Sequence, residues 1–349
     1  MNQPARGKAS VVAIVQAAAL GDLVVALPMA CAIKQHDPSA RVLMVAREYS
    51  RPLVEASRWL DGYLDSEAVL ANPQLLREHG VTTLINPKQS MPLGVAARRA
   101  GVPMRIGKLN PRSLLWANRY IRLETRLVQR HRALLNLEFL KPMGIDIAPT
   151  IDALGGMLGL DRLQPLSAEA RALLDPDRFN LVLHPKSNGS GREWPTAHYE
   201  RLLDRLPSDR FRVFVTGRAN EGAVLSRESK LLERPEVVDL TGRFKLGEMI
   251  AFLQAADGFI ASGTGPLHIA AGVGTRALGL FPGRATITAA RWHPLGANGE
   301  SLSVRSDCKP GPGTCAMNFG GGPCACLSDI SPEMVAQRVL AWLDQPQGR

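Results

Sequence analysis

Two glycine-rich loops and one isolated aspartate are the parts of this sequence whose residue types and spacing suit chemistry. The first loop lies in GFIASGTGPLHIAAGVGTRALGLFP at 258–282, where Gly263 and Gly265 follow an apolar strand and precede a helix that begins near Pro266. Unpaired backbone N–H groups and the positive end of the helix dipole then face the strand's carboxyl end. The pattern predicts an anion-binding turn, and an ordinary strand-to-helix connection is the alternative interpretation.

A second loop of suitable composition follows a strand that ends at His184. It reads PKSNGSGREWP from 185 to 195 and offers backbone amides, hydroxyl groups and the cations Lys186 and Arg192. These groups suit a diphosphate, although either cation can instead be solvated. Because the carboxyl ends of parallel strands share one edge of a sheet, we expect this loop and the Gly263 turn to converge.

Two carboxylates near strand ends are candidates for hydroxyl binding or proton transfer. Glu221 lies in the loop that starts at Thr216, and it is a candidate acceptor for a ribose hydroxyl. Asp22 ends the apolar loop QAAALGD, which is not the G-x-G-x-x-G of a dinucleotide fold, and a helix from about Leu23 to Gln35 follows. Asp22 can act as a helix cap or as a general base, and both roles stay open at this point.

Alternating strands and helices must position these loops. Apolar runs predict strands at 11–15, 41–46, 82–86, 181–184, 212–216, 259–261 and 277–281. The intervening segments are long enough for helices, and this rhythm is typical of parallel sheets. An i, i+3, i+4, i+7 stripe from Leu246 to Leu253 predicts a helix with a buried face, and Ser331-Pro332 suits the start of a terminal helix.

The connection from about Met143 to Pro176 is rich in Pro, Gly and Asp and separates two runs of strands. A chain of 349 residues with 45% hydrophobic content is long enough for two domains of ordinary size. We therefore expect doubly wound α/β domains at 1–160 and 175–330. We also expect them to face one another across a cleft that the loops above line.

The formal net charge of +10 is concentrated in one segment. Between Arg98 and Arg132 there are ten Lys and Arg residues and one acid, Glu124. Such a field suits a phosphorylated saccharide or an anionic lipid, and a solvated basic surface is the alternative. Nucleic acid is not an expected partner, because the segment lacks interleaved aromatics and a finger, RNA-recognition or helix-turn-helix signature.

Residues 11–33 are apolar and follow Arg6 and Lys8, as in a signal peptide or a membrane span. Gly21, Asp22 and Pro28 interrupt the run, and a charge in the middle of a span costs several kcal/mol, which argues against both. We expect a cytoplasmic protein whose basic face makes peripheral contact with the inner face of the inner membrane.

Four of the five cysteines lie close together near the C-terminus. The spacing of Cys308, Cys315, Cys324 and Cys326 is C-x6-C-x8-C-x-C, which is not a standard zinc pattern. Free thiols in a loop are the leading interpretation. A structural metal site is the alternative, and a disulfide is favoured less than either.

Several longer stretches together resemble one known family. They are LGDLVVALPMACAIKQHDPSARVLMVA, EASRWLDGYLD at 55–65, LVLHPKSNGSGREWP, the Thr216-Gly217 pair, DLTGRFKLGEMIAFLQAADGFIASGTGPLHIAAGVGTRALGLFPG, and the late cysteines followed by ISPEMV. Over most of the chain they resemble glycosyltransferase family 9, the bacterial ADP-heptose:lipopolysaccharide heptosyltransferases of GT-B architecture.

The resemblance implies a metal-independent, inverting transfer of a heptose or related sugar from an ADP-sugar to a phosphorylated lipopolysaccharide inner-core acceptor, with no cofactor required. Direct displacement at the anomeric carbon needs a base for the acceptor hydroxyl and positive charge beside the leaving diphosphate. Matched to the family pattern, Asp22 is the base and Phe244 approaches the nucleobase. The resemblance also implies that a C-terminal helix at 331–349 packs back on the N-terminal domain.

The predicted binding residues fall into two groups. The candidate donor-binding residues, besides Phe244, are Lys186, Ser187, Arg192, Glu221, Gly263, Thr264, Gly265 and His268. The candidate acceptor-binding residues are Arg98, Arg99, Lys108, Arg112, Arg122 and Arg126.

The chain departs from the family pattern at the glycine turn. Family members usually read Asp-Ser/Thr-Gly before the His, whereas Gly263 stands at the Asp position here, which leaves the donor sugar open. Arg192 stands where Lys is common and keeps the charge while adding a bidentate fork. Two other functions stay open: a non-catalytic nucleotide-sugar-binding protein, and a nucleotide-sugar epimerase, which the absence of a second clear acid/base residue disfavours.

Overall fold

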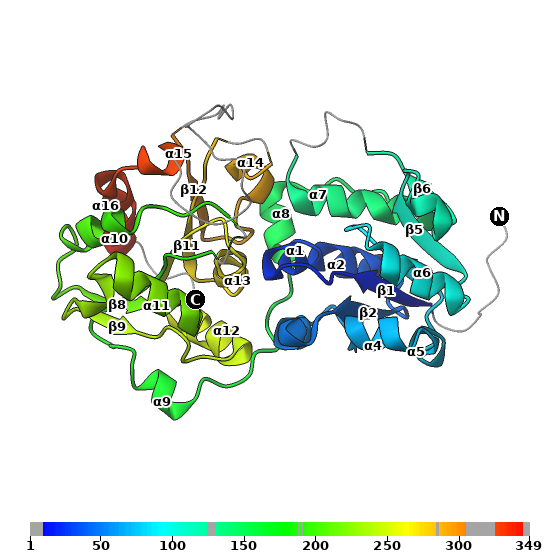
Figure 1. Ribbon diagram of the computed structural model, residues 1–349, viewed down its shortest axis with the longest axis horizontal. Coiled ribbons are helices and arrows are strands. Elements are labelled where there is room, and N and C mark those ends of the chain that lie inside the picture. The colour runs from blue at the N-terminus through cyan, green and yellow to red at the C-terminus, as the bar shows by residue number, and fades with distance from the viewer. Residues whose placement is uncertain are drawn as a thin grey trace. The chain divides into compact units, whose positions relative to one another are not determined.

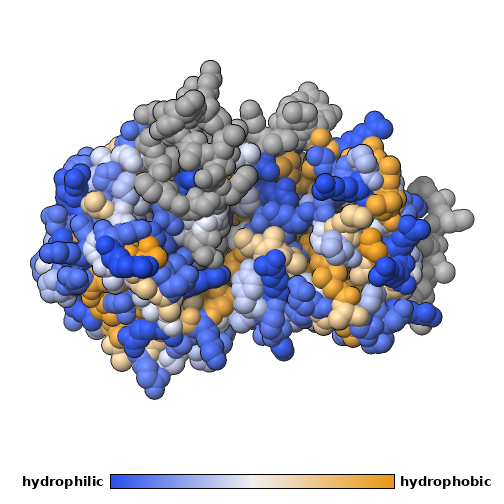
Figure 2. Space-filling model, viewed as in Figure 1, coloured by the Kyte–Doolittle hydropathy of each residue, from blue (hydrophilic) through white to orange (hydrophobic). Residues whose placement is uncertain are grey.

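The computed structural model describes residues 10–123, 130–187, 189, 191–283, 286–304 and 325–344. The chain divides into two compact units, unit 1 at 1–162 and unit 2 at 163–349. The division falls inside the connection that the composition indicated. No helix within the described ranges has the length and apolar character to cross a bilayer. Figure 2 shows hydrophilic side chains over much of the viewed surface, with hydrophobic ones among them.

Unit 1 is built on a parallel six-stranded sheet in the order β3-β2-β1-β4-β5-β6 (Figure 1). Its strands are β1 (Val11–Val15), β2 (Arg41–Ala46), β3 (Gly62–Asp65), β4 (Thr83–Ile85), β5 (Met104–Lys108) and β6 (Arg119–Ile121). Its α-helices are α1 (Leu20–Val24), α2 (Leu27–His36), α3 (Arg51–Glu55), α4 (Ser66–Ala71), α5 (Gln74–Glu78), α6 (Met91–Arg99), α7 (Arg132–Leu137) and α8 (Ile151–Gly156). Short 3-10 helices are η1 (Glu48–Ser50), η2 (Ser113–Leu115) and η4 (Glu138–Met143).

Unit 2 contains a second parallel six-stranded sheet, in the order β12-β11-β10-β7-β8-β9. Its strands are β7 (Phe179–His184), β8 (Phe211–Val215), β9 (Val237–Asp239), β10 (Gly258–Ser262), β11 (Arg276–Leu280) and β12 (Gly299–Leu302). Its α-helices are α9 (Ala168–Arg171), α10 (Thr196–Leu203), α11 (Ala219–Glu228), α12 (Leu246–Ala255), α13 (Gly265–Gly272), α14 (Ala289–Trp292), α15 (Ala325–Ser328) and α16 (Pro332–Ala341). The 3-10 helices are η5 (Leu231–Glu233) and η6 (Trp342–Asp344).

Both sheets therefore confirm the expected pair of doubly wound α/β domains. Each unit orders its six strands, counted from the unit's own first strand, as 3-2-1-4-5-6, so the order reverses between β1 and β4 in unit 1 and between β7 and β10 in unit 2. Ligands of open α/β sheets bind outside the carboxyl ends of the strands at such a switch point. A ligand is therefore expected at the loops that follow these four strands.

The central strands form because their apolar runs are buried on both faces. All five residues of β1 are buried, and Val11, Ala13 and Val15 pack with residues of α4, α5 and α6 in one core cluster. By strand alternation Val12 and Ile14 point to the opposite face. In unit 2 the same alternation places Phe179, Leu181 and Leu183 of β7 in a core cluster with residues of α10, α11 and α16.

One prediction about a helix needs correction. Asp22 is not in a loop, because α1 begins at Leu20 and places it in the first helical turn, and a second helix begins only at Leu27. The C-terminal helix α16 contributes to the core of unit 2. Val335, Val339 and Trp342 belong to this core, and the Trp342 ring stacks 6.1 Å from that of Phe179. The packing of 331–349 on the N-terminal domain stays a prediction.

Candidate functional site

The Lys186–Arg192 loop and the Gly263 turn lie together at the switch point of unit 2. The strands β7 and β10 that lead into them are neighbours, with His184 paired to Ala261. The Trp194 N–H donates to Ser262 Oγ at 3.1 Å, and a Cβ built on Gly191 would lie 2.9 Å from the carbonyl oxygen of Gly263. The expected convergence of the two loops is confirmed.

The conformation of the Lys186 loop is fixed by carboxylates that the sequence reasoning did not single out. Lys186 Nζ lies 2.9 Å from Glu193 Oε2 and 2.8 Å from Glu228 Oε2. Glu193 Oε1 also accepts the Ser187 N–H at 2.9 Å and the Ser187 hydroxyl at 3.1 Å. Burial acts to lower the pKa of Lys186, but the hydrogen bonds to Glu228 and Glu193 outweigh it and raise that pKa.

Lys186 therefore remains protonated, and two carboxylates already balance its charge. Its structural contribution is to hold Glu193 and so the loop. Arg192, which is 9% exposed, is the second cation of the same loop. Glu193 was visible in the sequence as an acid next to Arg192, whereas Glu228 comes from α11 and no local pattern connects it to the loop.

The Gly263 turn leads into α13, and the Thr264 hydroxyl at the start of this helix does not cap it. Thr264 is the N-cap residue of α13, in an extended conformation and without a side-chain capping hydrogen bond. It is only 4% exposed, and its Oγ1 has no hydrogen-bond partner among the residues that the structure describes. A buried hydroxyl in this state costs free energy unless a ligand or water satisfies it, so the turn is suited to an oxygen-rich anion.

The space beside Gly263 is filled by an aromatic ring. A Cβ at this position would lie 2.9 Å from Cε1 of Phe281, closer than real Cβ contacts allow. A carboxylate side chain at position 263 therefore requires the Phe281 ring to move. His268 is buried in α13 below the turn, with its ring 5.9 Å from that of Trp292.

The loops after β8 and β9 lie at the same edge of the sheet. The Gly242 N–H donates to the carbonyl of Gly217 at 2.8 Å and joins the two loops. Glu221 Oε2 accepts the Arg218 N–H at 2.7 Å, so this carboxylate stabilises the start of α11. The Phe244 ring is partly buried and lies 5.0 Å from that of Phe252. The predicted contacts of Glu221 with a ribose and of Phe244 with a nucleobase stay predictions.

In unit 1, Asp22 lies at the switch point and is paired with a lysine that the sequence reasoning missed. Asp22 is 8% exposed, and Lys88 Nζ lies 2.5 Å from its Oδ1. Asp22 follows β1 and Lys88 follows β4, the two strands between which the order reverses. The N-cap of α1 is Ala19, and no side chain within the described ranges caps this helix. The capping role that the sequence left open for Asp22 is therefore not the one observed.

Lys88 lies in a short loop that hydrogen bonds between Asn86 and Ser90 close. Asn86 Oδ1 accepts the Ser90 N–H at 3.0 Å, and Asn86 Nδ2 donates to the Ser90 carbonyl at 2.8 Å. Gln89 has φ 58°, a left-handed conformation that few residues with a side chain adopt. The sequence signal for Lys88 was NPKQS directly after a strand, although nothing in that pattern indicated which side chain Lys88 contacts.

Other buried polar groups surround α1 with unused hydrogen-bonding capacity. Gln16 is 1% exposed, and neither its Oε1 nor its Nε2 has a hydrogen-bond partner within the described residues. Burial lowers the pKa of Arg132, an effect that attraction to Asp22 opposes, and Arg132 Nε has no hydrogen-bond partner in the same part of the chain. Asn136 Nδ2 donates to the Val25 carbonyl at 2.9 Å, while its Oδ1 accepts no hydrogen bond from any residue that the structure describes. Native interiors rarely leave so many buried polar atoms unsatisfied, so this region suits a polar substrate.

The predicted acceptor-binding cations lie on α6, β5 and the segments that follow β5. Arg99, Lys108, Arg112 and Arg122 are exposed. Arg98 is exposed too, and its Nη1 donates to the Leu115 carbonyl at 2.6 Å. Arg126 lies outside the described residues, as do Cys308, Cys315 and Cys324.

No group of three or more His, Cys, Asp or Glu side chains arranged to hold a metal ion occurs within the described ranges. Cys326, the one member of the predicted cysteine cluster that the structure describes, is buried as a free thiol. The predicted cluster as a whole is therefore not tested.

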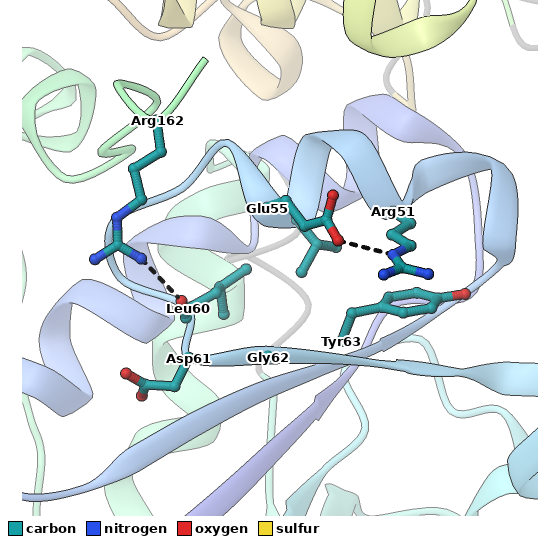
Figure 3. A pocket seen from close by; sticks show the side chains of 8 residues that line it. Arg51, Glu55, Leu60, Asp61, Gly62, Tyr63 and Arg162 are labelled. Atoms are coloured by element: carbon teal, nitrogen blue, oxygen red, sulfur yellow. Dashed lines mark hydrogen bonds and ion pairs between the residues drawn. The ribbon is translucent and has the colours of Figure 1, made fainter. Parts of the chain in front are cut away.

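A cavity of about 470 Å³ lies along the edge strand β3 of unit 1, apart from the predicted residues (Figure 3). Its charged side chains already have partners, some of them outside the lining. Arg51 Nε lies 2.7 Å from Glu55 Oε1, and Asp61 Oδ2 accepts the Val42 N–H at 2.7 Å and lies 2.6 Å from Lys34 Nζ. These pairings give the cavity no evident chemistry.

Comparison with known proteins assigns the chain to a family. The sequence profile described as glycosyltransferase family 9 (heptosyltransferase) matches residues 70–317. The chain belongs to glycosyltransferase family 9. It is 23% identical over 280 residues to lipopolysaccharide heptosyltransferase 3 of Escherichia coli (strain K12), covering 75% of this chain and 79% of that protein.

Solved structures give the same result for the fold. E. coli ADP-heptose lipopolysaccharide heptosyltransferase II is 17% identical, with a TM-score of 0.73 and coverage of 96% of this chain and 99% of that chain. E. coli heptosyltransferase WaaC, solved with ADP, is 16% identical, with a TM-score of 0.69 and coverage of 95% and 99%. These structures establish the GT-B architecture. Membership of the family establishes glycosyl transfer, which is favoured over nucleotide-sugar binding alone and over epimerisation.

Proposed function

We propose that this glycosyltransferase moves a heptose or a related sugar from an ADP-sugar to a phosphorylated inner-core acceptor of lipopolysaccharide, with inversion and with protein cations rather than a metal ion at the leaving diphosphate. The proposal rests on one observation above all: Asp22 is a buried carboxylate at the switch point of unit 1, where it is paired with Lys88 and attracts Arg132. The names of the related heptosyltransferases, one of them solved with ADP, support the donor and acceptor classes.

Asp22 suits the role of general base. Its Oδ1 lies 2.5 Å from the Lys88 ammonium, and because a carboxylate offers about four lone-pair sites, this ion pair leaves capacity to accept a hydroxyl proton. When the acceptor oxygen attacks the anomeric carbon from the side opposite the diphosphate, its proton passes to this carboxylate and the diphosphate leaves with the bonding electron pair. Inversion at the anomeric carbon follows from that single displacement.

The loops at the switch point of unit 2 suit the donor. Backbone N–H groups at the start of α13, the Thr264 hydroxyl and the Arg192 guanidinium offer hydrogen bonds and positive charge to a diphosphate. Charge that develops on the leaving group is stabilised best by such fixed dipoles and cations. The loop carrying Phe244 lies at the same edge and is proposed to contact the adenine.

The test is replacement of the base. Asp22→Asn should lower the transfer rate by about two to four orders of magnitude and leave the affinity for ADP unchanged, because the amide keeps the shape of the carboxylate but accepts no proton. Product formation from ADP-heptose and a truncated core acceptor measures the rate, and calorimetric titration measures ADP binding. Asp146→Asn, at a side chain that is 73% exposed, is the matched control. Turnover by Asp22→Asn at the native rate removes Asp22 as the base.

A further inference from the structure

Tyr49 is an exposed aromatic residue at the edge of the sheet where Asp22 lies. It belongs to η1, which follows β2, and it is 43% exposed. Because β1 and β2 are neighbouring parallel strands, the segments that follow them leave the same edge of the sheet. The Gln16 N–H donates to the Val45 carbonyl at 2.8 Å and holds these two segments together. Tyr49 therefore lies on the edge that also carries Asp22.

The hydroxyl group of Tyr49 is bonded to the segment that leads to Asp22. Tyr49 Oη donates to the Ala18 carbonyl at 3.0 Å. The next residue, Ala19, is the N-cap of α1, and Asp22 lies in the first turn of that helix. Ala17, Ala18 and Ala19 carry only methyl groups, so this segment has no long side chain that could cover the ring. The polar tip of Tyr49 is thus satisfied while much of its apolar surface stays in solvent.

The backbone that carries the Tyr49 ring is fixed on both sides. The N–H and the hydroxyl of Ser50 both donate to the Arg47 carbonyl, at 2.9 and 2.6 Å. Pro52 restricts the first turn of α3, and Leu53 of the same helix is buried. A tyrosine has only two side-chain torsions, and here both ends of the side chain are held. A ligand that packs on the ring therefore costs little conformational entropy.

We infer that a sugar ring of the acceptor packs on the face of Tyr49 while the acceptor hydroxyl meets Asp22, an inference that rests on the proposed function. A general base must lie within hydrogen-bond reach of the proton that it accepts. The acceptor therefore occupies the edge of the sheet on which Tyr49 lies, and neighbouring strands are only about 4.8 Å apart.

The chemistry of a sugar suits this ring. The hydroxyl groups of a pyranose point mainly away from its rim, and its faces present C–H groups that carry a small positive charge. The face of an aromatic ring is negative, so the two surfaces attract each other in addition to excluding water. Cations on the same unit attract phosphates whatever carries them, whereas the Tyr49 ring recognises the sugar itself. Tyr49 is thereby assigned to acceptor specificity.

Steady-state kinetics with the full-length protein separate the role of the ring from that of the hydroxyl. Tyr49→Leu should raise KM for a lipid-free core saccharide by about tenfold, the factor expected of an aromatic contact, and leave KM for the ADP-sugar unchanged. Tyr49→Phe keeps the ring and should keep the native KM for both substrates. Tyr120→Leu is the matched control, because Tyr120 Oη also donates to an alanine carbonyl, that of Ala117 at 2.6 Å, from the edge strand farthest from β2.

A second measurement needs neither donor nor turnover, and loss of folding cannot imitate it. The chain contains four tyrosines, so incorporation of 3-fluorotyrosine gives a fluorine NMR spectrum with few signals. Tyr49→Phe identifies the signal of position 49. That signal should shift as the core saccharide is added, whereas the signal of Tyr199, which is 0% exposed, should not.

Three results overturn the inference: a native KM for the saccharide in Tyr49→Leu, an equal rise of that KM in Tyr49→Leu and Tyr49→Phe, or a Tyr49 fluorine signal that does not respond to the saccharide. The second result would assign the effect to the hydrogen bond with Ala18. If the native protein forms no product from any ADP-sugar, the proposed function fails instead. The fluorine spectrum then still decides whether a saccharide packs on Tyr49.

Discussion

At the scale of single residues, the ion pair between Asp22 and Lys88 is the main finding beyond the motifs. The sequence placed Asp22 correctly after the first strand, because a lone carboxylate in an apolar segment stands out. It did not identify Lys88, Arg132 or Gln16, because these side chains reach the region of Asp22 from segments distant in the sequence or carry no pattern of their own. The pairing partners of a charged group depend on tertiary contacts, which no local spacing encodes.

Lys88 is expected to position the base. Lys88→Met should lower kcat by about 100-fold, because a displacement of the carboxylate by about 1 Å is enough for a loss of that size, while KM for the ADP-sugar stays unchanged. Steady-state kinetics with both substrates varied measures the two constants separately. Lys88→Arg should recover part of kcat, and a loss of donor affinity without a change in kcat would contradict the positioning role.

At the scale of elements, the burial of a strand on both faces decides whether its sequence predicts it. The strands β1 and β2 were predicted with their observed bounds, and β7, β8, β10 and β11 to within two residues at each end, because continuous apolar runs mark strands buried on both faces. The strands β3, β5, β6, β9 and β12 were missed. They lie at or next to the sheet edges and contain exposed or half-buried residues, so their short sequences lack such a run.

The end of β7 gives a prediction of pH dependence. Burial, with a smaller effect of Arg218, lowers the pKa of His184 from 6.5 to about 4, and its Nδ1 lies 3.0 Å from Thr216 Oγ1. Between these two pH values His184 is protonated in the unfolded chain but neutral in the folded chain. This residue therefore destabilises the fold increasingly as pH falls from 6.5 towards 4. The loss should reach about 3 kcal/mol, the product of the pKa difference and 1.36 kcal/mol per unit.

Urea unfolding of native protein and of His184→Gln at a series of pH values provides the measurement. The difference between the two unfolding free energies should change across this window and be constant above pH 7. Parallel curves for the two proteins down to pH 4 would show that His184 does not titrate in the way its burial requires.

At the scale of the whole molecule, the uneven distribution of charge is expected to make the kinetics with the two substrates respond differently to ionic strength. Because unit 1 carries most of the net charge, raising the ionic strength should lower kcat/KM for a phosphorylated acceptor much more than kcat/KM for the ADP-sugar. Screening shortens the Debye length from about 10 Å at 0.1 M to about 3 Å at 1 M. Initial rates across a salt series measure this, with a dephosphorylated acceptor as the control. An equal response of both acceptors would place the phosphates away from the basic segment.

The packing of α16 and Trp342 in unit 2 has a consequence for synthesis of the chain on the ribosome. Trp342 stacks on Phe179 and its Nε1 donates to Glu300 Oε1 at 2.7 Å, so the core around the first strand of unit 2 is complete only after residue 342 has been synthesised. The segments of unit 1 have all been synthesised by residue 162. The apolar strands of the nascent second unit thus stay uncovered until α16 follows them, and this half of the protein is the one expected to engage chaperones.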